Sequence, residues 1–143
     1  MNWKAEAIDK LRKYDAMRQA VQNIPEEISR LEIAACSIRS AQTDGMPVKG
    51  GGNGREDMLL NNFVHRQELH WSYQQAQSWL KSADRALSAL TPEEKLVLHR
   101  FYICPERGGV DRLCQQLGVE QSSVYRKRDK ALHKFTVALY GIP

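Results

Sequence analysis

The sequence predicts an all-α protein, in which a long antiparallel helical hairpin with coiled-coil-like spacing is followed by a domain of three shorter helices. Three observations support this fold class. Apolar residues recur every three or four positions through most of the 143 residues. A glycine-rich segment at residues 43–54 separates the first two long stretches, and Thr91-Pro92 opens a third. We therefore expect a hairpin domain over residues 1–90 and a second domain over residues 91–143.

The first long stretch carries apolar residues at mostly alternating steps of three and four, which gather on one side of a helix. They are Trp3, Ala7, Leu11, Tyr14, Met17, Val21, Ile24, Ile28, Leu31, Ala35 and Ile38. Pro25 interrupts this series. With Asn23 before it and Glu26 and Glu27 after it, Pro25 fits the start of a new helix. Because the spacing continues across Pro25, a single kinked helix fits as well.

The segment TDGMPVKGGGNG, residues 43–54, interrupts every helical pattern. Three consecutive glycines near Lys49 suggest a phosphate-binding loop. However, a Walker A loop needs GK followed by Ser or Thr, placed between a strand and a helix, and this segment lacks both features. We interpret it as a flexible connection between two helices, although twelve residues is long for a simple turn.

The helical pattern resumes at Arg55 and continues to Leu90, with one apolar seam at alternating steps of four and three. The seam consists of Leu69, Tyr73, Ala76, Leu80, Ala83, Leu87 and Leu90. Two seams joined by a loop predict an antiparallel helical hairpin.

The second long helix also has apolar residues outside its seam. Leu59, Leu60, Phe63 and Val64 widen the apolar surface. At about 100° per residue, Trp71 lies roughly 160° around the helix from the seam residue Tyr73. A second apolar face indicates a second neighbour, which could be the C-terminal domain, another protomer or a partner protein. The alternative is that Trp71 is a single exposed residue with no neighbour. We favour a homo-oligomer formed through the N-terminal helices.

The last domain begins with a helix-start signal. Thr91 is placed to cap the helix, Pro92 takes its first position, and Glu94 stands where a capping box requires it. This helix carries Leu96, Val97, Leu98 and Phe101 and is expected to stop before Pro105.

Residues 110–132 are predicted to form a helix-turn-helix. A short stripe is followed by Gly118, where a helix commonly ends, and a second stripe begins at Val124. The first stripe consists of Val110, Leu113, Cys114 and Leu117, and the second continues through Ala131, Leu132 and Phe135. The plainer alternative is a pair of core helices with a solvated basic face.

The polar face of the second helix favours double-stranded DNA as a partner. We expect Gln121, Ser122, Tyr125 and Arg126 to contact base edges, and Lys127, Lys130 and Lys134 to contact phosphates. Residues 91–143 hold nine Lys/Arg against six Asp/Glu, whereas residues 1–90 hold 12 against 11. The positive charge is therefore concentrated where the DNA contacts are predicted.

The C-terminal part resembles region 4 of the sigma-70 family. The matching segments are LTPEEKLVLHRFYI at 90–103 and VDRLCQQLGVEQSSVYRKRDKALHKF at 110–135. Over its full length the chain resembles a small family from phages and prophages of Gram-positive bacteria, through IPEEISRLE, SIRSAQTDGMPVKGGG, REDMLLNN and FTVALYG. That family is described as sigma-factor-like and lies near late-gene regulators of the ArpU/RinA type.

The resemblance implies a sigma region 4-like helix-turn-helix whose base-reading positions match Gln121, Ser122, Tyr125 and Arg126. This chain departs from the region 4 pattern at Glu120, where the family often has a Ser or Thr cap, and at Arg128, a position often apolar. The chain has no room for sigma regions 2 and 3, so it is not expected to be a complete sigma factor.

These observations predict a sequence-specific DNA-binding regulator of phage or prophage transcription. One alternative is a small terminase subunit, which also joins a helix-turn-helix to helical oligomerisation segments and takes part in DNA packaging. Another is an adaptor that binds RNA polymerase through the region 4-like fold.

The sequence does not favour an enzyme or a metalloprotein. The four histidines have no partnered nucleophile, and a zinc site at His99, Cys104 and Cys114 lacks closely spaced ligand pairs. We expect no cofactor. Three cysteines without a CxxC pair, no signal peptide and no membrane-spanning segment predict a cytoplasmic protein that does not enter the membrane.

Overall fold

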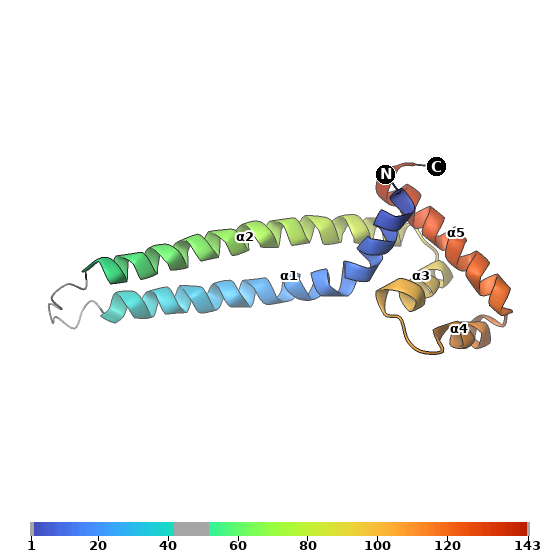
Figure 1. The fold of residues 1–143 in the computed structure, drawn as a ribbon, viewed down its shortest axis with the longest axis horizontal. Coiled ribbons are helices and arrows are strands. Elements are labelled where there is room, and N and C mark those ends of the chain that lie inside the picture. Colours follow the sequence, from blue (N-terminus) through green and yellow to red (C-terminus); the bar gives the residue numbers. More distant parts are fainter. Residues whose placement is uncertain (1, 42–51, 143) are drawn as a thin grey trace. The chain divides into compact units, whose positions relative to one another are not determined.

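The computed structural model describes residues 2–41 and 52–142, and within these ranges it contains helices and no strand. Figure 1 shows the elements in chain order. They are α1 (Trp3–Ser40), α2 (Gly52–Ser88), α3 (Pro92–Leu98), the π-helical turn η2 (His99–Ile103), α4 (Gly109–Leu117) and α5 (Gln121–Tyr140). The predicted all-α class is therefore confirmed. Residues 43–51 of the predicted loop lie outside the described residues, and residues 52–54 belong to α2.

Helix α1 is continuous through Pro25. Of the two interpretations of this proline, the structure therefore has one helix rather than a new helix start. The seam keeps its spacing on both sides, because Val21, Ile24, Ile28 and Leu31 are all buried or partly buried while Pro25 is exposed. An exposed proline removes one backbone hydrogen bond without disturbing the packed side of the helix.

The chain divides into two compact units, and each is described by itself. Unit 2 comprises Gln19–Gln77 and contains paired stretches of α1 and α2 that run antiparallel. Ile28 and Ala35 of α1 and Ala76 of α2 are buried in it. Polar contacts also join the two helices, since the Asn62 side-chain amide donates to the Leu31 carbonyl oxygen at 2.8 Å. The long helix pair predicted from the two seams is confirmed.

Unit 1 comprises Met1–Arg18 and Ser78–Pro143. Its larger core cluster draws on the first turns of α1, the last turns of α2, α3 and the second half of α5. Its buried members are Ala7, Leu11, Ala86, Leu90, Leu98, Ala131, Leu132 and Phe135. The rings of Trp3 and Tyr140 lie beside this cluster with their centroids 4.8 Å apart.

Residues from both ends of the chain pack together in unit 1. Ala7 and Leu11 from one end of the chain enclose the same cluster as Phe135 from the other. Tyr14 donates a hydrogen bond to Asp84, which links α1 to α2 within this unit. Burial, together with that hydrogen bond and the charge of Asp84, raises the pKa of Tyr14 to about 12.

The predicted start of α3 is confirmed in detail. The Glu94 backbone N–H donates to the Thr91 hydroxyl at 3.2 Å, and the Thr91 N–H donates to the Glu94 carboxylate at 3.1 Å. This reciprocal capping box satisfies two backbone donors at the helix start. The α-helical part ends at Leu98, and the wider turn η2 then carries Phe101 before the chain reaches Pro105.

Candidate nucleic-acid interface

Helices α4 and α5 are joined by the three residues Gly118, Val119 and Glu120. Gly118 ends α4 in the left-handed conformation, with φ of 64°. The following Val119 N–H donates to the Cys114 carbonyl oxygen at 3.2 Å, which closes the end of α4. The left-handed residue turns the chain sharply enough for α5 to begin only three residues later.

A small core cluster local to the C-terminal helices fixes α4 against α5. Val97 of α3, Leu113 of α4 and Val124 of α5 have no exposed surface. The partly buried residues around them are Leu96, Phe101, Val110, Cys114, Leu117 and Val119. The whole first predicted stripe lies in this cluster, together with Val124 of the second. The rest of the second stripe, Ala131, Leu132 and Phe135, is buried in the larger core cluster instead.

One face of α5 remains exposed, and it contains most of the predicted contact residues. Gln121, Ser122, Tyr125, Arg126 and Lys130 are all classed as exposed. Their spacing places them on a single side of the helix. Asp129 and His133 lie on the same exposed side. Neither was predicted to contact DNA, because neither carries a permanent positive charge.

The start of α5 leaves its backbone donors without a side-chain cap. Glu120 occupies the N-cap position with extended backbone, but its side chain makes no capping hydrogen bond. The first N–H groups of a helix that lack such a partner attract anions, since the helix dipole is positive at that end. Glu120 is thus an N-cap residue that leaves the helix start uncapped, unlike the Ser, Thr, Asn or Asp found most often at this position.

Tyr125 and Arg128 form a stack with Phe101 of η2. The Tyr125 and Phe101 rings are 5.9 Å apart, and the Arg128 guanidinium lies 5.0 Å from the Tyr125 centroid and 5.2 Å from that of Phe101. Arg128 thus covers part of both aromatic rings by stacking on them. Tyr125 keeps 36% of its surface exposed, so part of its side chain stays accessible while these contacts hold it.

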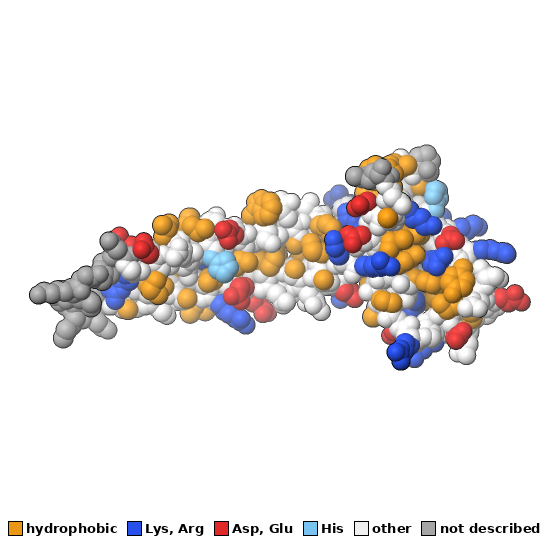
Figure 2. Space-filling model, viewed as in Figure 1, with side chains coloured by type: hydrophobic (Ala, Val, Ile, Leu, Met, Phe, Trp, Pro, Cys, Tyr) orange, Lys and Arg blue, Asp and Glu red, His pale blue; other side chains and the backbone are white. Residues whose placement is uncertain are grey.

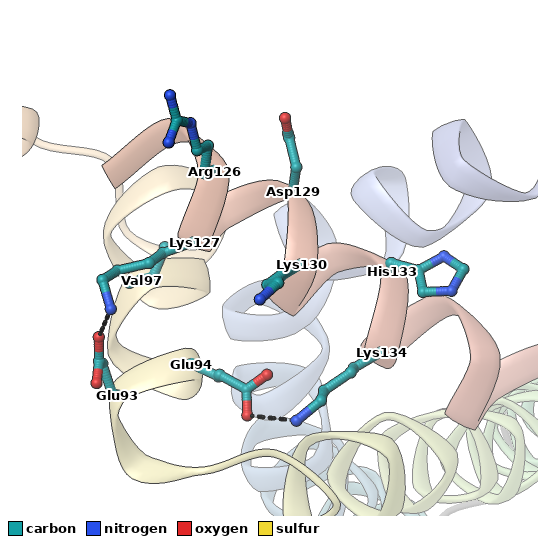
Figure 3. Close-up of a pocket in the computed structure, with 9 residues that line it drawn as sticks. All are labelled: Glu93, Glu94, Val97, Arg126, Lys127, Asp129, Lys130, His133 and Lys134. Atoms are coloured by element: carbon teal, nitrogen blue, oxygen red, sulfur yellow. Dashed lines mark hydrogen bonds and ion pairs between the residues drawn. The ribbon is translucent and has the colours of Figure 1, made fainter. Parts of the chain in front are cut away.

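Two of the predicted phosphate-contacting lysines are already paired with acids of α3. Lys127 Nζ lies 2.5 Å from Glu93 Oε1, and Lys134 Nζ lies 3.1 Å from Glu94 Oε1. Figure 3 shows these pairs and Lys130 between them, while Arg126 and Asp129 point away. Within the part of the chain that the structure describes, no ion pair is found for Arg126 or Lys130. The seven predicted residues are thus not electrostatically equivalent.

The Glu94 carboxylate serves both the helix cap and Lys134. Burial acts to raise the pKa of Glu94, but the hydrogen bonds from Thr91 and Lys134 and the charge of Lys134 outweigh it, so the pKa is lowered. The ionised carboxylate therefore stabilises the fold. Its side chain is only 16% exposed, which keeps this ion pair partly shielded from solvent.

A groove of about 780 Å³ lies between α3 and α5. It is lined by Glu93, Glu94, Val97, Arg126, Lys127, Asp129, Lys130, His133 and Lys134. Four permanent cations and three acids share this lining, so the groove is a mixed electrostatic surface. The uncompensated positive charge lies at Arg126 and Lys130, on the side toward the exposed face of α5.

Charge is distributed unequally between the two units. Residues 19–77 of the sequence hold five Lys/Arg and seven Asp/Glu, whereas the residues of unit 1 hold 16 and ten. Figure 2 shows Lys and Arg side chains spread over the C-terminal helices. A polyanion is therefore attracted to unit 1 and not to unit 2.

Other kinds of site receive no support from the described residues. Residues 2–41 and 52–142 contain no group of three or more His, Cys, Asp or Glu residues placed to hold a metal ion. Cys36 and Cys104 are exposed free thiols, while Cys114 is partly buried against the small core cluster. Over the same ranges, no helix has both the length and the apolar character needed to cross a bilayer.

Comparison of the chain with protein-family models, with curated proteins and with solved structures finds no match.

Proposed function

We propose that this protein binds double-stranded DNA through the exposed face of α5 and regulates transcription of phage or prophage genes. In this proposal α3, α4 and α5 form a helix-turn-helix domain of the sigma region 4 type. The observation that carries it is the geometry at the start of α5. A short helix and a three-residue turn support a helix whose exposed residues combine amide, hydroxyl and guanidinium groups with an uncompensated lysine.

Each exposed residue has a chemical role in this proposal. Gln121 bonds adenine through its amide, and Arg126 bonds guanine through its guanidinium, each with about 1–3 kcal/mol of discrimination. Ser122 bonds either base or phosphate. The accessible side of the Tyr125 ring packs on a thymine methyl group, and the Arg128–Phe101 stack holds the ring in place.

The ion pairs within the chain determine how much each lysine is expected to contribute to phosphate binding. Lys130 contacts phosphate directly, because no acid competes for it among the described residues. Lys127 and Lys134 contact phosphate only by leaving Glu93 and Glu94, so their net contribution is smaller. The uncapped start of α5 adds backbone N–H donors for a further phosphate.

Selection of binding sites from a random duplex pool, using the full chain at two salt concentrations, tests the proposal. We expect an enriched sequence that persists at the higher salt concentration, since base readout depends less on salt than phosphate attraction does. Arg126→Ala should relax the preference at one base position while the other positions stay selected. Binding to no duplex at low salt would overturn the proposal, and co-purification with RNA polymerase in that case would favour the adaptor alternative.

A further inference from the structure

Within unit 2, helix α2 has apolar residues on two opposite faces. Its inner seam, which includes Leu69, Tyr73 and Ala76, is buried or partly buried. On the outer face, Leu60, Phe63, Val64 and Trp71 are between 45% and 66% exposed. At about 100° per residue, these four residues fall on one stripe on the side of the helix away from the seam. A helix of a simple two-helix hairpin needs only the inner seam.

The outer face of α1 has no matching stripe. Between residues 19 and 41, Ile33 is the one large hydrophobic side chain that is strongly exposed. The uncovered apolar surface of unit 2 therefore belongs mainly to α2. Figure 2 shows hydrophobic side chains on the surface along the paired helices.

The interior of unit 2 is thin for helices of this length. Ile28, Ala35 and Ala76 are its buried hydrophobic residues in the described part of the chain, and two of the three are alanines. Long helices gain most of their stability from packing rather than from propensity. A second helix packed on the outer stripe would give α2 a second buried face and so add to the packing that holds it.

The charge of unit 2 and the spacing of the two aromatic residues fit a second copy as the occupant of the stripe. Unit 2 has five cations and seven acids, so two copies repel each other only weakly and neither attracts a polyanion. The stripe is also arranged about the exposed residue Gln67. Phe63 precedes it by four positions and Trp71 follows it by four. In a two-fold antiparallel pair centred on Gln67, Phe63 of one copy lies at the level of Trp71 of the other.

We propose that the outer stripe of α2 is a self-association surface, on which a second copy docks antiparallel, α2 against α2. The paired Phe63 and Trp71 rings form its apolar contacts, and the two Gln67 amides bond to each other at the centre, where each supplies both a donor and an acceptor. This dimer does not depend on DNA binding.

The size of the stripe sets the expected strength. A fully covered aromatic side chain buries roughly 150–250 Å², so the half-exposed Phe63 and the more exposed Trp71 together offer on the order of 200 Å² per copy. With Leu60, Val64 and flanking polar groups, the contact stays at or below the lower end of specific interfaces, which is about 1,200 Å² in total. We therefore expect dissociation in the micromolar range.

Sedimentation equilibrium of the full chain without DNA, across the micromolar range, tests the proposal. The wild-type chain should be a dimer, and the double variant Phe63→Gln/Trp71→Gln should have its dissociation constant raised at least tenfold. Ile33→Gln is the matched control, because Ile33 is 68% exposed and Trp71 66%, but Ile33 lies on α1. Circular dichroism confirms that each variant keeps its helices.

Oxidative cross-linking tests the register. In a background with Cys36, Cys104 and Cys114 changed to serine, Gln67→Cys should form a disulfide dimer readily, whereas Ser29→Cys on the exposed side of α1 should not. A monomeric wild-type chain, a ring of eight or more copies, or equal weakening by Ile33→Gln would overturn the proposal. Cross-linking as efficient at residue 29 as at residue 67 would do the same.

Discussion

Replacing Lys130 with glutamine should flatten the salt dependence of duplex binding, whereas the same change at Lys127 should have a smaller effect. Both lysines lie on α5 and line the same groove. They differ in that Lys127 is 2.5 Å from the Glu93 carboxylate, whereas no acid is paired with Lys130 in the described ranges. A lysine that leaves a carboxylate for a phosphate exchanges one anion for another. The phosphate still loses its counterions, but the freed carboxylate attracts a cation in turn, so the net release of ions is smaller.

The magnitude follows from counterion release. Each phosphate neutralised on a duplex contributes about 0.9 to the slope of log affinity against log salt concentration. Over a fourfold rise in salt, one contact therefore accounts for about a 3.5-fold loss of affinity. The Lys130→Gln variant should lack this factor on every sequence alike. The Lys127→Gln variant should show less than half of the change in slope.

Fluorescence anisotropy with a labelled duplex, titrated at several salt concentrations, measures both slopes. A selected site and a random duplex should be compared, because loss of a phosphate contact leaves their affinity ratio unchanged. Equal changes of slope in the two variants would contradict the role that the ion pairs assign to Lys127. An unchanged slope for Lys130→Gln would contradict direct phosphate contact by Lys130.

Three further predictions concern the turn, the cap and the exposed face. Gly118→Ala should lower the free energy of unfolding, measured by thermal or denaturant unfolding, by about 1–2 kcal/mol, because alanine is strained at the φ of 64° that Gly118 adopts. Gly109→Ala is the control and should not lower it in this way, because the added carbon makes only ordinary contact with a carbonyl oxygen. Because the pKa of Glu94 is lowered in the folded chain, the ionised carboxylate stabilises the fold above pH 4.5, and this stabilisation is lost as the pH falls below that value. The Glu94→Gln variant should therefore have a lower Tm than the wild-type chain at neutral pH and a smaller fall of Tm in acid. A fall of Tm in acid as large as that of the wild type would contradict this. Asp129→Asn should raise the affinity for random duplex by up to roughly fivefold, because it removes a repulsive charge near a phosphate and frees Arg128, whose guanidinium lies 3.1 Å from the Asp129 carboxylate. A loss of affinity would show that the carboxylate contacts a base.

The contacts that could be predicted correctly from the sequence are those between residues close together in the chain or on one helix. Spacing along one helix is enough to locate Leu113 and Val124 in the small core, and the capping box at Thr91 joins residues only three positions apart. The same reasoning placed Lys127 among residues free to contact phosphate, because Glu93 is 34 positions away in the chain and its proximity depends on how α3 packs on α5. The stack of Arg128 on Phe101 likewise joins two elements whose relative placement no periodicity specifies.

The least predictable feature is the dependence of α5 on both ends of the hairpin helices, and it has a testable consequence. In the isolated fragment 91–143 the cluster of Val97, Leu113 and Val124 is complete, but Leu132 and Phe135 lose the covering side chains of α1 and α2. Burial of two such side chains is worth about 3–6 kcal/mol, which is comparable to the whole stability of a small domain.

Hydrogen exchange should therefore show protected amides in the first half of α5 in the fragment and fast exchange around residues 131–137, whereas the full chain protects both halves. A fragment that protects both halves and melts at the same temperature as the full chain would show that residues 1–18 and 78–90 are dispensable to the C-terminal helices. If the fragment behaves as expected, a fragment that fails to bind DNA would show only that α5 is no longer fully folded, and not that the full chain lacks a DNA-binding face. DNA binding should therefore be measured on the full chain.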